Sequence, residues 1–197
     1  MGLSQWRHLG YGRFKTTYSD QQGLYDYDGR IGRGCTGYPP EFDLGALIKW
    51  PNDIFIGNKK VAGLLLELSA EADTVHYCLL GIGIDVNVPL NQFSSALQKD
   101  ITSISAELGH EVDRASFLAR ILREFENHYL LIESGEYDTV IREWKSLSCT
   151  LDRRVDIRTL KNSFSGEAID IDEFGALIIR KDNGKLERVI AGDCFHH

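Results

Sequence analysis

The sequence has few of the residues that build metal sites and disulfide frameworks. Its 197 residues include four cysteines, which lie far apart at Cys35, Cys78, Cys149 and Cys194. No two of them have the Cys-x-x-Cys spacing, so neither a zinc site nor a disulfide framework is expected, and the thiols are predicted to be reduced. The six histidines also lack metal-ligand spacing.

Long apolar runs and basic runs are missing as well. No segment approaches the apolar length that crosses a membrane, and the first residues do not have the pattern of a signal peptide. The formal net charge is −7, with no run of lysine or arginine, which argues against broad nonspecific binding of nucleic acid. We therefore expect a cytoplasmic protein that contacts neither a membrane nor nucleic acid.

What the sequence does contain is typical of a globular protein, with 43% hydrophobic and 26% charged residues. Residues 1–45 are rich in Gly, Tyr and Arg and show no sustained period. From Ala46 onward the pattern becomes orderly. It predicts strands over 46–50, 54–56, 60–68 and 75–88, and helices over 101–108, 113–134 and 138–147, the second of them capped by Asp113 and ended by Gly135.

After Ser148 the period changes to that of short strands. Apolar alternation predicts strands over 155–158, 164–171, 176–180 and 187–190, separated by turns that contain Asn or Gly. The sequence therefore predicts an α/β fold (α+β), in which a mixed sheet with helices (46–147) is followed by a small SH3-like β-barrel (148–197).

The most informative stretch is Lys49-Trp50-Pro51-Asn52-Asp53, with Lys60 seven residues after Asp53. Taken singly, Lys49 and Lys60 would be solvated surface charges, and Asn52 and Asp53 would bond their own turn. A hairpin, however, brings Lys60 back beside that turn. Two cations and one carboxylate then come from one hairpin, which suits a carboxylate or phosphate substrate.

A second stretch, Gly81-Ile82-Gly83-Ile84-Asp85-Val86-Asn87, ends the last of the predicted strands before the helices. Glycines at a strand end more often mark a bulge or tight packing than a phosphate cradle. The pattern does not continue as Gly-x-Gly-x-x-Gly, and no helix clearly starts there. A Rossmann-type dinucleotide site is therefore excluded.

Together, Lys49–Asp53 and the Lys-x-Ala-Gly-x-Leu-x-Glu pattern of Lys60–Glu67 resemble the biotin protein ligases. That family joins biotin and ATP as biotinyl-5′-AMP and transfers biotin to a lysine of a carboxyl-carrier protein. The resemblance implies ATP and biotin as substrates, Mg²⁺ as cofactor, a biotin carboxyl-carrier protein domain as partner, and leaves a homodimer open. It implies Lys60 and Asp53 as catalytic residues; Lys60, Trp50 and Lys49 as biotin-binding residues; and Asn52, Asp85 and Asn87 as ATP-binding residues. Metal ligands are not assigned.

The chain departs from the family pattern in two places. Asp85 stands where asparagine is usual, and a carboxylate there would repel a triphosphate unless Mg²⁺ lay between them. The family's Gly-Arg-Gly-Arg-x-Gly-Arg loop is also missing, because Gly29–Gly34 lies too close to Lys49 to be its equivalent. A coding frame read one base later over 4–9 and 25–36 permits family-like segments. We therefore expect residues 1–45 to be frameshifted, the chain to be truncated, and ligase activity to be impaired.

Two other functions stay open at this point. A lipoate-type ligase shares the fold and the adenylate chemistry, and competition between biotin and lipoate would separate it from a biotin ligase. A noncatalytic module that binds the carrier protein is favoured by Asp85 and by the missing arginine loop. Carrier binding that is indifferent to ATP and biotin would support that second alternative.

Overall fold

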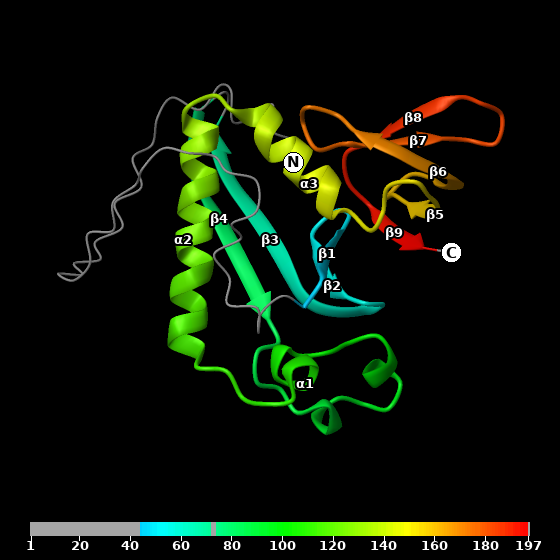
Figure 1. Ribbon diagram of the computed structural model, residues 1–197. Helices are drawn as coiled ribbons and strands as arrows, with labels where there is room; N and C mark the ends of the chain where they lie inside the picture. Colours follow the sequence, from blue (N-terminus) through cyan, green and yellow to red (C-terminus); the bar gives the residue numbers. More distant parts are fainter. Residues whose placement is uncertain (1–43, 72–73, 197) are drawn as a thin grey trace.

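The computed structural model describes residues 44–71 and 74–196. Within them the chain forms a four-stranded sheet, three α-helices and a five-stranded sheet, in that order (Figure 1). The segment predicted to be frameshifted, 1–45, lies outside the described residues except for its last two positions. The arrangement confirms the predicted α/β class with a following β-rich unit.

The first sheet is a meander of four strands, each paired antiparallel with the next: β1 (Ala46–Lys49), β2 (Asp53–Ile56), β3 (Lys59–Glu71) and β4 (Thr74–Ile84). A mixed sheet was expected, and this sheet is antiparallel wherever the chain is described. Parallel pairing there is limited to two isolated bridges, Ile48 with Ser148 and Lys60 with Ile101.

The helices follow the sheet in the chain: α1 (Ile104–Leu108), α2 (Arg114–Glu133) and α3 (Tyr137–Leu147), preceded by the short 3₁₀ turns η3 (Leu90–Gln92) and η4 (Leu97–Lys99). Asp113 caps α2 as predicted, because its carboxylate accepts a hydrogen bond from the Ser116 amide at 2.8 Å. α1 begins later than the predicted residue 101, because the Ser103 hydroxyl caps it and Ile101 bridges to β3.

The core of this first unit lies where the base of the sheet meets α1 and the start of α2. Its buried side chains come from β2, β3, α1 and the turn before α2: Ile56, Val61, Ala62, Ile104 and Val112. In the described part of the chain, no helix combines the length and the apolar character needed to span a bilayer.

The second unit is a five-stranded antiparallel sheet that curls on itself, called here the C-terminal barrel (Figure 1). Its strands are β5 (Arg153–Arg158), β6 (Ser163–Ile171), β7 (Leu177–Arg180), β8 (Leu186–Val189) and β9 (Asp193–His196), in the spatial order β8-β7-β6-β5-β9. The sequence predicted the first four. β9 was missed because its four residues show no clear alternation, and it pairs with β5, far away in the chain.

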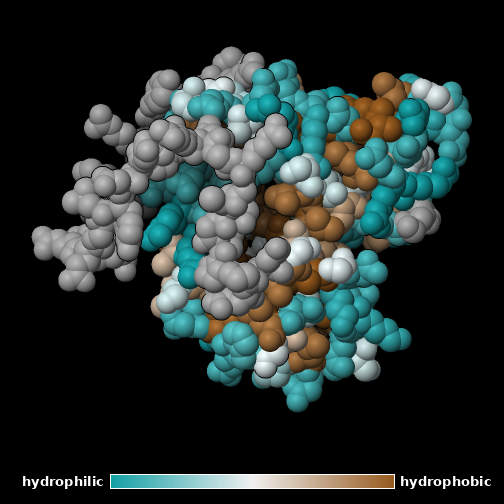
Figure 2. Space-filling view, viewed as in Figure 1, coloured by the Kyte–Doolittle hydropathy of each residue, from teal (hydrophilic) through white to brown (hydrophobic). Residues whose placement is uncertain are grey.

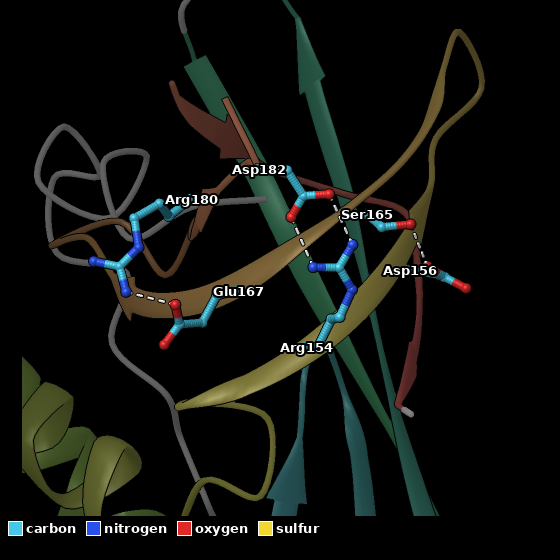
Figure 3. Close-up of polar contacts among 6 residues, drawn as sticks. All are labelled: Arg154, Asp156, Ser165, Glu167, Arg180 and Asp182. Atoms are coloured by element: carbon cyan, nitrogen blue, oxygen red, sulfur yellow. Dashed lines mark hydrogen bonds and ion pairs between the residues drawn. The ribbon is translucent and has the colours of Figure 1, made fainter. Parts of the chain in front are cut away.

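Charged side chains on the outside of the barrel are paired with one another (Figure 3). Arg154 makes a two-pronged ion pair with Asp182, at 2.7 and 2.9 Å, and Arg180 contacts Glu167 at 2.5 Å. Exposed pairs of this kind contribute little to stability. These pairs therefore leave the buried core, with Ile157, Leu177 and Ile179 fully enclosed, as the main source of barrel stability.

Candidate functional site

One row of residues crosses all four strands of the first sheet. Lys49 pairs with Asp53, Asp53 with Gly63, and Gly63 with Gly83. Directly paired residues in antiparallel strands present their side chains on the same face. The row therefore gathers a cation, a carboxylate and two residues without side chains on one face, called here the site face.

Lys60 reaches the site face because of a β-bulge. The pairing of β2 with β3 shifts between Ile54 and Phe55, so that Ile54 faces Ala62 while Phe55 faces Lys60, and Val61 is the extra residue. Regular alternation would have placed Lys60 on the opposite face, which is the core side. With the bulge, Val61 and Ala62 are both buried and Lys60 lies on the site face with Phe55.

The backbone of Lys60 is held from its other side as well. Its amide donates to the Asp100 carbonyl at 2.8 Å, and its carbonyl accepts from the Thr102 amide at 2.9 Å. The segment around Ile101 thus continues the sheet beside the start of β3. Because both edges of this short stretch are hydrogen-bonded, the position of the Lys60 side chain is set by rigid backbone.

Lys60 and Asp53 form the central ion pair of the site. The Lys60 Nζ lies 2.6 Å from Asp53 Oδ1, and the two side chains are 43% and 24% exposed. A Cβ placed on Gly63 would come within 3.1 Å of that Nζ and 3.4 Å of that carboxylate oxygen. Glycine at position 63 therefore leaves the room in which the pair forms, and the hairpin prediction that joined Lys60 to this turn is confirmed.

Glycines leave part of the site face without side chains. Gly81 and Gly83 are two residues apart on β4 and share the face with Gly63, and Gly81 pairs with Leu65. A Cβ on either β4 glycine would meet the backbone only at ordinary distances, 3.6 Å or more. The result is a floor of exposed backbone beside the lysine, on which a ligand can lie flat. Figure 2 shows hydrophobic surface in the middle of one face of the molecule, below the barrel.

Asp85 comes directly after β4, and its carboxylate interacts electrostatically with Lys60. It is half-buried, and burial raises the pKa of its carboxyl, which the charge of Lys60 opposes. Its amide donates to the Val61 carbonyl at 3.0 Å, and its carbonyl accepts from the Ile104 amide at 2.8 Å, so its backbone is tied to the bulge and to α1. Lys60 is thus paired with Asp53 and also acts electrostatically on Asp85.

The side chains of the two predicted asparagines form hydrogen bonds to the backbone of neighbouring segments. Asn52 donates from its amide nitrogen to the Leu64 carbonyl at 2.5 Å, and its own carbonyl accepts from the Leu64 amide. The Asn87 side chain donates to the Val112 carbonyl at 2.8 Å and accepts from the Val112 amide at 3.0 Å. Beside Asn87 is an open depression of about 500 Å³, lined by Asn87, Glu111, Val112, Asp113 and Arg114.

Lys49 and Trp50 differ in placement. The Lys49 ammonium lies 4.9 Å from the centre of the Phe55 ring, in a cation–π contact on the site face. The Trp50 side chain is 3% exposed and belongs to the core of the C-terminal barrel, where its ring nitrogen donates to the Gly175 carbonyl at 3.1 Å. The site therefore gathers Lys49, Asp53, Lys60 and Asp85, while Trp50 lies in the barrel.

Sequence reasoning missed the glycine floor and the bulge. The signal for the bulge was present, because strict alternation cannot bury both Val61 and Ala62 and also expose Lys60. Among the described residues, no group of three or more His, Cys, Asp or Glu side chains is arranged to hold a metal ion. A cation at this site would therefore need oxygen atoms from a bound substrate as well.

Two ligase family models match the two units of this chain. Residues 38–85 match the Biotin/lipoate A/B protein ligase family, and residues 150–197 match the Biotin protein ligase C terminal domain. The chain belongs to the biotin protein ligase family.

Individual relatives point the same way. The chain is 36% identical over 146 residues to the bifunctional ligase/repressor BirA of Bacillus subtilis, a match that covers 74% of this chain and 45% of that protein. It is 31% identical over 141 residues to a biotin–[acetyl-CoA-carboxylase] ligase of Paracoccus denitrificans, covering 70% of this chain and 58% of the relative. The chain thus spans about half the length of these relatives.

Solved structures share the fold. The apo biotin protein ligase of Aquifex aeolicus superposes with a TM-score of 0.67 at 22% identity, covering 77% of this chain and 65% of that one. The same enzyme in complex with biotin and ATP gives a TM-score of 0.65 at 23% identity, covering 77% and 62%. The arrangement of the sheet, helices and barrel is therefore that of known biotin ligases.

Proposed function

We propose that this chain carries the lysine-bearing part of a biotin–protein ligase site. The reaction is the ATP-dependent formation of biotinyl-5′-AMP, followed by transfer of biotin to a lysine of a biotin carboxyl-carrier protein. The observation that carries the proposal is the Lys60–Asp53 pair, which lies 2.6 Å apart on a floor of bare glycine backbone. Membership of the family supports the same reaction.

The chemistry explains why a lysine belongs there. In the first step a carboxylate oxygen of biotin attacks the α-phosphorus of ATP, and pyrophosphate leaves. Both reactants are anions, so a fixed cation at their meeting point lowers the barrier. Lys60 supplies that cation, and the biotin carboxylate competes with Asp53 for its ammonium group. In the second step the amine of the carrier lysine attacks the acyl carbon, and AMP leaves.

The acidic residues fit a magnesium ion. Mg²⁺ is usually held by one or two carboxylates together with substrate phosphates. Asp53 pairs with Lys60 at 2.6 Å, and the charge of Lys60 also lowers the pKa of Asp85 against the effect of burial. We assign these two side chains to Mg²⁺, which when bound would neutralise phosphate charge. Without the ion, Asp85 would repel the triphosphate of ATP. The role of Asp85 is therefore to hold the nucleotide through a cation.

The remaining residues have supporting roles. Lys49, on the same row as Asp53, is a secondary cation for the biotin carboxylate. Asn52 and Asn87 fix the backbone of the nucleotide side through their bonds to Leu64 and Val112. A homodimer and a cytoplasmic location belong to the same proposal. Sedimentation of the full chain would show whether it dimerises.

Lysine substitution in the full chain tests the function. We expect the wild-type chain, given biotin, ATP and Mg²⁺, to release pyrophosphate and form biotinyl-5′-AMP slowly, in keeping with the impaired activity expected from the sequence. We expect Lys60→Gln to abolish both. Lys59→Gln is the matched control, because Lys59 is the neighbouring lysine but pairs with Ile56 on the opposite face. Loss of activity in the control, or none in K60Q, would contradict the assignment.

One alternative function is favoured by the carboxylate at position 85. Without a cation, Asp85 should repel a triphosphate, which suits a noncatalytic module that binds a carrier protein. Carrier binding measured with and without ATP and biotin distinguishes the two functions, since a noncatalytic module binds equally under both conditions. Competition between biotin and lipoate for the site face separates a biotin ligase from a lipoate-type ligase.

A further inference from the structure

A chain of hydrogen bonds joins the C-terminal barrel to Trp50, which directly follows Lys49, the first residue of the row on the site face. The Trp50 amide donates to the Thr150 hydroxyl oxygen at 3.0 Å, and that oxygen lies 3.1 Å from Nε2 of His196, on β9. Thr150 is fully buried, and His196 is half-buried at the strand end. The Thr150 hydroxyl thus links Trp50, the residue that follows Lys49, to the last strand of the barrel.

The direction of these bonds follows from the charge of the histidine. Burial, together with the charges of Lys49 on β1 and Arg153 on β5, lowers the pKa of His196 to about 4. The ring is therefore neutral near pH 7. Since the Thr150 oxygen accepts from Trp50, its proton is free to be donated to Nε2, and the ring proton then resides on Nδ1.

We propose that Thr150 and His196 are positioning residues, through which the C-terminal barrel holds the Lys49–Asp53 corner in register with Lys60. Trp50 lies directly after Lys49 at the end of β1. Its backbone is fixed by Thr150 and its ring by Gly175. A shift of the barrel would therefore move Trp50 and, with it, Lys49 and the turn that leads to Asp53. A further backbone bond, from the Cys149 amide to the Ile48 carbonyl at 2.9 Å, sets the same spacing.

The geometry explains why this link matters for the site. Lys49 is paired with Asp53, and Asp53 is the partner of Lys60. A displacement of Trp50 is therefore passed along one strand pair to the ion pair. The effect of this displacement on ligand binding rests on the proposed function. The position of the Lys49–Asp53 segment itself does not.

Amide chemical shifts of the full chain test the positioning directly. We expect Thr150→Val, which keeps the shape and removes the hydroxyl, to shift the amide signals of Trp50, Asp53 and Gly63, and Thr150→Ser to restore them. Thr159→Val is the matched control. Its hydroxyl donates to the Asn162 carbonyl in the β5–β6 turn, away from Trp50. A folded T150V protein with unchanged signals at Asp53 and Gly63 would overturn the proposal.

The ring of His196 gives an independent spectroscopic signature. Two-bond proton–nitrogen correlation spectra should show the Nδ1–H tautomer near pH 7 in the wild type and its loss in T150V. His196→Gln, whose side chain can still accept at the Nε2 position, should keep the site signals. His196→Leu should move them. A wild-type ring protonated on Nε2 at pH 7 would contradict the hydrogen-bond chain.

Ligand binding separates this proposal from the proposed function. If both are right, T150V binds biotin about fivefold to tenfold more weakly than wild type, and T150S binds normally. If the wild-type chain binds no biotin but the amide shifts behave as expected, the positioning stands and the ligase assignment fails. If biotin binds equally well to wild type and T150V, the positioning proposal fails and the ligase assignment stands.

Discussion

Gly63 faces Asp53 across β2 and β3, and a side chain at position 63 would come within 3.1 Å of the Lys60 ammonium group. The ion pair at the centre of the site thus depends on the smallest residue of the row. Glycine in a strand interior usually weakens the strand. Here it gives the flexible end of Lys60 space to contact either Asp53 or an incoming carboxylate.

Substituting Gly63 should weaken ligand binding without unfolding the protein. In Gly63→Ala the new methyl group displaces only the end of a flexible side chain, so we expect a loss of about tenfold in biotin affinity and little change in the melting temperature. Gly81→Ala is the control, because its Cβ would meet only Leu65, at ordinary van der Waals distances of 3.6 Å or more. Calorimetric titration measures the affinity, and equal losses in both variants would exclude a specific role for Gly63.

Removing the charge of Asp85 should have opposite effects with and without magnesium. Without the ion, Asp85→Asn removes a repulsion, and we expect ATP to bind about fivefold more tightly. With saturating Mg²⁺ the same variant loses a carboxylate ligand and should bind ATP more weakly than wild type. Asp100→Asn serves as the control for an exposed carboxylate nearby. An effect of the same sign in both conditions would remove Asp85 from the magnesium site.

His128 should stabilise the contact between α2 and α3 at low pH. Burial alone would lower its pKa, but the Glu124 carbonyl at 2.7 Å and the Glu143 carboxylate at 3.0 Å raise the pKa above 6.5. The stabilisation is therefore complete below pH 6.5 and is lost as the pH rises through the raised folded-state value. Urea unfolding between pH 5 and 9 measures it. His128→Gln should lack this decline, and an unchanged decline would assign it to other groups.

His196 should make folding stability depend on pH with the opposite sign, lowering it at acid pH. Its folded-state pKa is about 4, below the ordinary 6.5, so the unfolded chain binds a proton that the folded chain does not. We expect stability to fall as the pH falls from about 6.5 to about 4, and His196→Gln to reduce that fall. Urea titration of both proteins over this range is the measurement. Equal slopes would mean that His196 keeps its ordinary pKa in the folded chain.

The sequence allowed much of the fold to be predicted because the signals were local. Asp113, Gly135 and the alternating strands of the barrel each act within a few neighbouring residues. The pairing of Lys60 with Asp53 was also within reach, since a hairpin joins residues seven positions apart. Two features depended on contacts far away in the chain: the strand β9 and the barrel core around Trp50. No local pattern reports which distant surface will cover a side chain.

The position of Trp50 has a consequence for modularity. The covalent boundary between the two units was predicted at 147/148, yet an indole from residue 50 fills the core of the later unit. A barrel produced from residue 148 onward would have an empty volume in its core, and a first unit ended at residue 147 would expose a large aromatic side chain to water. The two units are therefore separable in the chain but interlocked in packing. Exchange of barrels between relatives should succeed only when the Trp50 corner is exchanged with them.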